Sequence, residues 1–446
     1  MKVSQIGLIP RKLESLDSQF PVQDMLIQTG QVTQFSSGIY GYGHIPFLVK
    51  KNINQIISDV LTKYGCSEIS LPILQPECLW QESGRLEKYV ASDVMFRSLT
   101  NKGNYCLAPT AEEAVVSYAK PLLTSYKNLP VTYFQIGEKF RNEIRTRGYL
   151  LRGKVFEMMD AYSFGRNQND LDVEYNKMKE AYLEIFNTLG LNTQAVIADN
   201  GDMGGKRSEE FMCLSLIGED KILVDETTGK AFNSELLEKP DYINFLKDNY
   251  GIEDINSLVT KKAVELGHIF QLGDVYGKSM NGTYIDEKDQ QQPFVMGCYG
   301  IGVSRTLAMV YENNIIKNNE GKFEGVVLPI NIAPYLVYII PKLDEKDKVD
   351  KALSVYNELN SYNVKVLYDD RVDMGIGAKI KDSKIAGTPY VVVFGNTLDQ
   401  GFVEVENNLT GAKIKLSTEE FIDIFKELQI TKKSNNSVEN IIKKDK

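Results

Sequence analysis

A loop at positions 140–153, FRNEIRTRGYLLRG, concentrates positive charge between two apolar runs. Its guanidinium groups belong to Arg141, Arg145, Arg147 and Arg152. The planar fork of arginine matches phosphate and carboxylate oxygens and stays charged, so the loop could hold an anionic ligand. Glu143 follows Arg141 by two positions, and residues two apart on a strand share a face. The pair could therefore meet an anionic group and a donor of one ligand, although a ladder of surface salt bridges would have the same composition.

A second polar pair lies in GNYCLAPTAEEAV, at positions 103–115, where Thr110 and Glu112 precede a helix-like run. A hydroxyl beside a carboxylate is suited to bind the ammonium group of a ligand. The same stretch also fits a helix cap, because Thr110 followed three residues later by Glu113 is a capping box. Both interpretations stay open at this point.

The stretch MGCYGIGVSR, at positions 296–305, places Gly297, Gly300 and Gly302 before Arg305. The order G-x-x-G-x-G differs from the dinucleotide-binding fingerprint, and no parallel βαβ unit surrounds it. The glycines instead favour a strand that passes tightly into a helix. Arg305 would then lie near the start of that helix, in a cleft with phosphate-binding geometry.

His268, in GHIFQLG, is one of only two histidines in the chain. A single histidine is more often a packed or hydrogen-bonded structural residue than a functional one. We therefore keep a structural role for His268 beside a role in ligand binding, and give His44 less weight still.

Periodicity predicts the elements that must position these side chains. The predicted strands are 67–76, which Pro76 ends, two arms of a hairpin around the arginine loop at 131–140 and 153–164, and shorter pieces around TQAVIAD, HIFQL and PFVMGCYG. The predicted helices are 46–64, 169–189 and 301–313.

Beyond residues 321–334 the pattern changes, and strands alternate with helices in a βαβ rhythm that predicts a small α/β domain. The predicted fold class is therefore α+β. We expect a mainly antiparallel domain over residues 1–325, an α/β domain over 333–431 and a flexible lysine-rich tail over 432–446.

Composition and charge narrow the class of protein. The five cysteines are far apart and form no C-x-x-C pair, which favours reduced thiols and excludes a zinc cluster of cysteine pairs. No apolar run approaches about 18 residues, so no membrane span is expected. The formal net charge of −9 gives no overall attraction to nucleic acid, and any such contact must use a local basic patch or shape.

Together these pieces resemble the class II aminoacyl-tRNA synthetases, and among them the prolyl-tRNA synthetases of the compact bacterial or organellar type without an editing insertion. SEISLPILQPECLWQESGR resembles motif 1, FRNE with the arginine loop and DAYSF resembles motif 2, and GCYGIGVSR resembles motif 3. The resemblance covers residues 6–428. It implies an antiparallel-sheet catalytic domain, an α/β anticodon-binding domain, and a proline–tRNA ligase that activates L-proline with ATP and transfers it to the 3′ end of tRNA(Pro).

The resemblance also implies roles for single residues. Arg141 and Arg305 would be the catalytic cations, and Glu265 would bind Mg²⁺. The ATP-binding residues would be Arg141, Glu143, Arg152, Phe156 and Arg305. The proline-binding residues would be Thr110, Glu112, Arg141, Asp160 and His268. The family further implies a homodimer, located in the cytoplasm or in the matrix of an organelle.

The chain departs from the usual family wording at several positions. PTAEE carries Ala111 where a histidine is usual, RTRGY replaces the usual motif 2 loop, and KVFEMMD replaces a more polar strand. A synthetase-like paralogue that keeps ligand binding without aminoacylation therefore stays a second hypothesis. A threonyl ligase is a third, but it would need a zinc-binding Cys/His set that the sequence does not offer.

Overall fold

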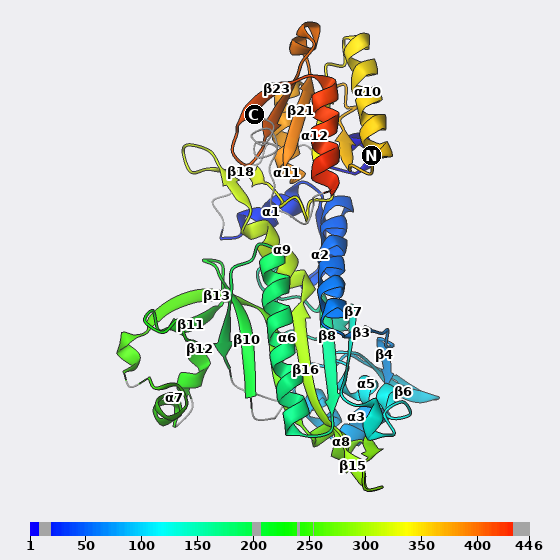
Figure 1. The fold of residues 1–446 in the computed structure, drawn as a ribbon, viewed down its shortest axis with the longest axis vertical. Helices are drawn as coiled ribbons and strands as arrows, with labels where there is room; N and C mark the ends of the chain where they lie inside the picture. The colour runs from blue at the N-terminus through cyan, green and yellow to red at the C-terminus, as the bar shows by residue number, and fades with distance from the viewer. Residues whose placement is uncertain (9–18, 199–206, 239–240, 253, 431–446) are drawn as a thin grey trace. The chain divides into compact units, whose positions relative to one another are not determined.

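The computed structural model describes residues 1–8, 19–198, 207–238, 241–252 and 254–430 (Figure 1). These residues form two compact units. Unit 1 comprises Met1–Ser36, Tyr40–Ile53 and Leu307–Lys446, and unit 2 comprises Ser37–Ile39 and Asn54–Thr306. The lysine-rich tail and the glycines of GDMGGK lie outside the described residues. No helix in the described part of the chain is both long and apolar enough to cross a bilayer.

Unit 2 is built on a nine-stranded sheet with the order β10-β9-β12-β11-β13-β16-β8-β7-β3. Its strands are β3 Ser67–Glu68, β7 Val131–Phe140, β8 Val155–Gly165, β9 Thr193–Ile197, β10 Arg207–Leu214, β11 Asp220–Val224, β12 Ala231–Asn233, β13 Val259–Gly273 and β16 Val295–Gly302. Neighbouring strands are antiparallel, apart from the parallel pairs β12–β9 and β3–β7. The expected antiparallel sheet and the hairpin around the arginine loop are confirmed.

Helix α6, Gln168–Thr188, covers one face of this sheet and packs on β8, β13 and β16 (Figure 1). Asn167 caps its first turn by accepting the backbone N–H of Asp170. Its buried side chains recur at helical spacing and include Leu171, Tyr175, Met178, Tyr182, Ile185 and Phe186. This apolar stripe fixes the sheet from behind, so the sheet can present polar side chains on its other face.

Smaller elements complete unit 2. They are α3 Glu77–Ser83, α4 Leu86–Ala91, α5 Glu112–Ala119, α7 Tyr242–Tyr250, α8 Val275–Ser279, the sheet of β4 Leu74–Pro76, β6 Gly103–Leu107 and β5 Arg97–Thr100, and the pair β14 Thr283–Ile285 and β15 Gln291–Pro293.

Helices α2, His44–Lys63, and α9, Val303–Glu312, match their predictions within a few residues.

The prediction of one strand over 67–76 is wrong. Residues 67–68 form β3 and pair with β7, whereas residues 74–76 form β4 and pair with β6 in another sheet. Pro72 lies between them and has no backbone N–H to donate to a ladder, which interrupts the pairing. Pro76 ends β4 as predicted. Strand β10 was not predicted.

Unit 1 contains a five-stranded sheet with the order β20-β19-β21-β22-β23. Its elements are β19 Val337–Pro341, α10 Lys346–Ser361, β20 Val366–Tyr368, α11 Ile376–Ile385, β21 Tyr390–Phe394, β22 Val403–Asn407, β23 Lys413–Leu416 and α12 Thr418–Ile430. The N-terminal part of unit 1 contains α1 Pro21–Gln28, β1 Val32–Ser36 and most of β2 Ile39–Tyr42, and β17 Ile315–Lys317 and β18 Phe323–Val326 precede the sheet in sequence. Strands β20, β19 and β21 are parallel, which confirms the βαβ prediction, and the antiparallel pair β22–β23 extends the sheet.

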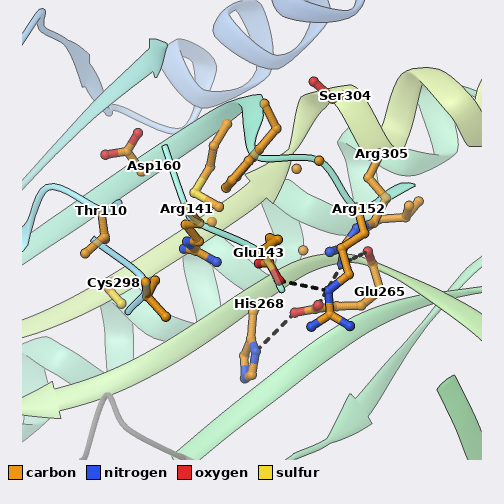
Figure 2. Close-up of a pocket in the computed structure, with 18 of the residues that line it drawn as sticks. Thr110, Arg141, Glu143, Arg152, Asp160, Glu265, His268, Cys298, Ser304 and Arg305 are labelled. Carbon is orange, nitrogen blue, oxygen red and sulfur yellow. Dashed lines mark hydrogen bonds and ion pairs between the residues drawn. The ribbon is translucent and has the colours of Figure 1, made fainter. Parts of the chain in front are cut away.

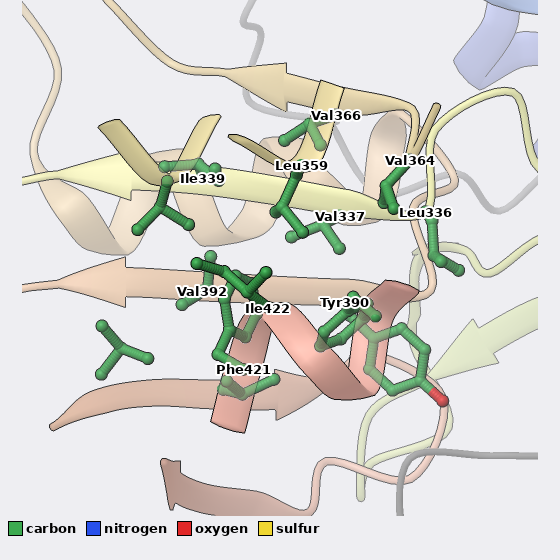
Figure 3. Close-up of a cluster of buried hydrophobic side chains, with 14 of the residues drawn as sticks. Leu336, Val337, Ile339, Leu359, Val364, Val366, Tyr390, Val392, Phe421 and Ile422 are labelled. Carbon is green, nitrogen blue, oxygen red and sulfur yellow. The ribbon is translucent and has the colours of Figure 1, made fainter. Parts of the chain in front are cut away.

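The core of this sheet follows the strand period of two. Val337 and Ile339 of β19 point to the same face as Val392 of β21, and α10 and α12 cover that face with Leu359 and Phe421 (Figure 3). All of these side chains are fully buried. The predicted α+β fold class, an antiparallel-sheet unit with a separate small α/β sheet, is therefore confirmed.

Candidate active site

A cavity of about 480 Å³ lies in unit 2, on the polar face of its sheet. Every predicted site residue lines it: Thr110, Glu112, Arg141, Glu143, Arg152, Phe156, Asp160, Glu265, His268 and Arg305. Figure 2 shows Thr110 and Asp160 toward the left, Arg152, Glu265 and Arg305 toward the right, and Arg141 between the two groups. We call the left part the acyl end and the right part the arginine end.

The acyl end is formed by Thr110 and Glu112, just before and at the start of α5. The hydroxyl of Thr110 donates to Oε2 of Glu112 at 2.5 Å, and both side chains are buried. The N-cap residue of α5 is Ala111, and it makes no side-chain cap. The capping-box interpretation is therefore wrong, and Thr110 instead orients a carboxylate toward the cavity.

Asp160, on β8, forms the floor of the acyl end. Its carboxylate pairs with Nζ of Lys139 at 2.6 Å, and it accepts hydrogen bonds from Gln135 and from the hydroxyl of Tyr162, each at 2.9 Å. The Tyr162 hydroxyl also accepts the backbone N–H of Ala111 at 3.1 Å. Burial raises the pKa of Tyr162 well above its usual range, so its phenol stays neutral and joins β8 to the start of α5.

Two lining groups at this end were missed by the sequence analysis. One is Cys298, on β16. Burial raises the pKa of its thiol well above the usual range, so the thiol stays neutral and unreactive where it lines the cavity. Tyr162 lies two residues from Asp160 on β8, and this shared strand face was a signal that could have identified it.

Arg141 lies between the two ends. Its Nε donates to the backbone oxygen of Pro109 at 3.1 Å, and its guanidinium carbon lies 5.3 Å from the centre of the Phe156 ring. The expectation that Arg141 and Glu143 share a strand face is wrong, because β7 ends at Phe140. A tight turn, in which Glu143 N–H donates to Arg141 O at 2.7 Å, brings both side chains to the cavity instead.

At the arginine end, the loop cations already have carboxylate partners. Arg152 Nε lies 3.2 Å from Glu143 Oε2, and Glu219 lies 3.2 Å from Arg147 and 3.8 Å from Arg152. Half of the Arg152 side chain is exposed to solvent. The loop thus contains surface salt bridges and cavity-lining arginines together, and Arg145 is exposed and does not line the cavity.

Arg305 lies in the first turn of α9, directly after the glycine-rich strand β16, as predicted. Its Nη1 donates to the backbone oxygen and to Oε2 of Glu265, at 2.7 and 2.8 Å, and its Nε donates to Leu151 O at 3.0 Å. Gly297 is required by packing, because a Cβ there would lie 2.2 Å from the Tyr299 hydroxyl.

A β-bulge brings Glu265 beside His268. Residues three apart on a regular strand face opposite ways, but the β10–β13 register shifts between Phe211 and Met212, which pair with Gly267 and Glu265. His268 Nδ1 consequently lies 3.3 Å from Glu265 Oε1, and its ring stacks on Phe270. The other histidine, His44, hydrogen-bonds Tyr335 in unit 1 and does not line the cavity.

Glu265 is the acidic group that fits a divalent cation. Burial alone would raise its pKa, but the hydrogen bond from His268 and the charge of Arg305 lower the pKa well below its usual range. Ligand atoms of Glu210, Glu265 and His268 lie within 4.8 Å of one another. A carboxylate oxygen is a ligand that Mg²⁺ prefers, so Glu265 fits such an ion if the ion replaces one of its present contacts.

Comparison with known proteins agrees with this architecture. The family model "tRNA synthetase class II core domain (G, H, P, S and T)" matches residues 96–314, and the model "Anticodon binding domain" matches residues 336–428. The proline–tRNA ligase of Ehrlichia canis is 34% identical, with 96% of this chain and 100% of the relative aligned. The proline–tRNA ligase of Sulfurimonas denitrificans is 33% identical, again with 96% of this chain and 100% of the relative aligned.

A longer relative and a solved structure extend the comparison. The proline–tRNA ligase of Lysinibacillus sphaericus is 31% identical over 568 residues, with 95% of this chain and 98% of the relative aligned, so it contains sequence that this chain lacks. The structure of Giardia lamblia prolyl-tRNA synthetase in complex with prolyl-adenylate has the same fold, with a TM-score of 0.71 and 18% identity over 93% of this chain and 76% of that one. By its fold, its matched domains and its full-length relatives, the chain belongs to the proline–tRNA ligases of the class II tRNA synthetases.

Proposed function

We propose that the cavity of unit 2 joins L-proline to ATP, releases pyrophosphate, and then transfers the prolyl group from prolyl-adenylate to the 3′ end of tRNA(Pro). The observation that carries this proposal is the order of charges along the cavity. A buried carboxylate stands at one end, several arginines stand at the other, and Arg141 lies between them (Figure 2). This order matches the groups that the two substrates would present in turn, which are the ammonium and carboxylate of proline and the phosphate chain of ATP.

The acyl end would bind proline. Glu112, oriented by the hydroxyl of Thr110, would accept the hydrogen bonds of the prolyl ammonium group. Asp160 and His268 line the remaining wall, and Asp160 is held by Lys139 so that its charge is already compensated. Arg141 would bind the substrate carboxylate and the α-phosphate together, which places the reacting atoms side by side.

The arginine end would bind ATP. Phe156 would stack on adenine, and Glu143 would accept a hydrogen bond from the exocyclic amine of adenine. Arg152 and Arg305 would bind phosphate oxygens. A carboxylate oxygen of proline attacks the α-phosphorus as the bond to the bridging oxygen breaks and pyrophosphate leaves. No protein nucleophile is needed, because positioning and charge neutralisation supply the catalysis. Mg²⁺, held by Glu265, would neutralise phosphate oxygens further.

The proposal includes the organisation of the chain. We assign the catalytic domain to residues 1–325 and the anticodon-binding domain to 333–431, with residues 432–446 as a separate lysine-rich segment. The anticodon-binding match over 336–428 supports tRNA as the partner. We also propose a C₂ homodimer, the commonest symmetry of oligomeric enzymes, located in the cytoplasm or an organelle matrix.

ATP–pyrophosphate exchange, measured with each of the twenty amino acids, tests the proposal. Exchange is expected with proline, and Arg141→Ala should lower it by at least about 10²-fold because the variant removes a cation from the transition state. Arg145→Ala is the matched control, since Arg145 belongs to the same loop but is exposed outside the cavity. A well-folded protein that exchanges with no amino acid would favour the synthetase-like paralogue, and exchange with threonine would favour the threonyl ligase.

A further inference from the structure

Behind the acyl end lies a buried charged cluster that joins Glu112, the proposed ligand of the prolyl ammonium group, to two residues without a role in the proposed reaction. It consists of Arg85, Glu112 and Glu113, with 12%, 2% and 0% of their side chains exposed. Nη1 of Arg85 donates to Glu112 Oε2 at 3.2 Å and to Glu113 Oε1 at 3.1 Å. Glu113 Oε1 also accepts the hydroxyl of Ser83 at 2.8 Å. One guanidinium nitrogen is therefore shared between two neighbouring carboxylates.

Neutral groups surround the cluster. The Arg85 guanidinium lies over the rings of Tyr89, Trp80 and Tyr276, and it donates to the hydroxyl of Tyr89. Burial raises the pKa of Tyr89 and of Tyr276, raises the pKa of the Cys106 thiol to about 12, and raises the pKa of Cys298 well above its usual range. These groups are uncharged near neutral pH and cannot balance a carboxylate.

The other carboxylates near the cluster already have cationic partners. Glu77 of α3 is paired with Arg97, Asp160 of β8 is paired with Lys139, and Arg141 faces the cavity where the substrate carboxylate would lie. The cluster itself has one cation and two carboxyl groups. When both are ionised, one negative charge has no counter-charge within the cluster.

Glu113 is the group that resolves this imbalance. Its Oε2 is buried and has no hydrogen-bond partner among the described residues. Burial above all, together with the charge of Glu112, raises the pKa of Glu113 to about 7, against the opposing charge of Arg85. Near neutral pH the Glu113 carboxyl is thus partly protonated in the substrate-free protein.

We propose that Glu113 is a positioning residue that releases its proton when the ammonium group of proline binds to Glu112. The incoming positive charge supplies the counter-charge that the second carboxylate lacks. Ionised Glu113 then holds Arg85, and Arg85 holds Glu112 against the substrate. Glu113 touches no substrate and acts through the other two residues. This inference rests on the proposed function, because it takes proline as the ligand of Glu112.

Calorimetric titration of the full chain with L-proline tests the inference directly. Binding heats at pH 7.0 in two buffers of different ionisation enthalpy give the number of protons released. We expect release of a measurable fraction of a proton for each proline bound at pH 7.0, and a smaller release at pH 8.5, where more of Glu113 is already ionised. Wild-type binding at pH 7.0 without proton release would overturn the inference, and this outcome does not depend on any variant folding.

Exchange kinetics give a second, independent readout. As pH rises from 6 to 8, the wild-type KM for proline should fall several-fold, because an ionised Glu113 adds attraction for a cation, while kcat changes little. Glu113→Gln should remove this slope and the proton release, once circular dichroism shows that it folds. A variant that kept the wild-type slope would contradict the inference.

Two further variants sharpen the assignment. Glu312→Gln is the matched control, since Glu312 of α9 also has a pKa raised by burial but does not line the cavity, and it should keep the wild-type pH profile. Arg85→Lys keeps the charge but loses the planar guanidinium group that contacts both carboxylates, so it should raise the KM for proline more than it lowers kcat.

Failure of wild-type protein to bind proline at all would count against the proposed function, whereas binding and exchange without proton release would count against this inference alone.

Discussion

The two ends of the cavity are built differently. At the acyl end, Thr110, Glu112 and Asp160 are each less than a tenth exposed, and every one is bonded to a neighbouring side chain. At the arginine end, Arg152 is half exposed, and Arg305 and Glu265 are each 31% exposed. In the proposed function, a small rigid amino acid would be met by fixed, desolvated groups, and a flexible triphosphate would be met by ion pairs that can exchange partners.

This difference follows from the elements that carry the residues. The acyl end uses β8, whose residues from Met159 to Gly165 are all buried, and the first residues of the short helix α5. The arginine end uses the connection between β7 and β8, where Arg145 and Arg147 are exposed, together with Glu265 of β13 and Arg305 of α9. Fixed hydrogen-bonding groups in a low-dielectric site give specificity, and exposed charges give adaptable attraction that salt weakens.

Glu112→Gln is the change that should break the acyl end most completely. The variant keeps the shape of the side chain but leaves the substrate ammonium without its carboxylate, and it leaves Arg85 paired with Glu113 alone. Breaking a buried ion pair costs about 3 kcal/mol or more, so kcat/KM for proline should fall by about 10²-fold. The KM for ATP should stay within about twofold if the two ends are independent.

Steady-state ATP–pyrophosphate exchange, with each substrate varied in turn, measures both values. Glu138→Gln provides the matched control, because Glu138 is an exposed residue of β7 that does not line the cavity. A Glu112→Gln variant that lost ATP affinity while keeping its KM for proline would reverse the assignment of the two ends.

Arg152→Ala should weaken the arginine end by a smaller amount. The side chain is half exposed, and such charges contribute about 1 kcal/mol, so the KM for ATP should rise by about fivefold while the KM for proline stays constant. The same exchange assay measures this effect, with Arg145→Ala as the control from the same loop. Equal changes in both KM values would show that the ends are not separable.

A change in ionic strength should also distinguish the two ends, and its effect on the KM values should be the smallest of these predictions. Raising salt from 0.05 to 0.3 M shortens the screening length to about 6 Å, and it should raise the KM for ATP by about two- to threefold through the exposed arginines. The buried contacts of proline are screened much less, so its KM should change by less than that. Exchange kinetics at constant free Mg²⁺ measure the difference, and a KM for proline that followed salt as steeply would argue against a desolvated acyl end.

The sequence was most informative where a signal is local. The hairpin, the long helix and the glycines before α9 depend on residues close in the chain, and their predictions are confirmed. Family motifs also named residues that all line one cavity. Roles of those residues stay predictions until the variants above are measured.

What the sequence could not supply depends on pairing between distant segments. Lys139 beside Asp160, and Arg85 beside Glu112, become neighbours only after the sheet and the short helices have packed. The bulge that turns Glu265 toward His268 depends on the register of β10, a strand that periodicity did not reveal. Likewise, a face shared by Arg141 and Glu143 required a strand that in fact ends at Phe140.

The carboxylates that pair with the loop arginines have one more consequence. Glu143 and Glu219 are tethered competitors, always present at high local concentration, and an anion that binds Arg152 competes with them for its guanidinium group. A single orthophosphate ion replaces too few of these contacts to compete well. A triphosphate engages several cations at once, so the self-paired loop acts as a filter that favours polyvalent anions over the simple anions of the cell.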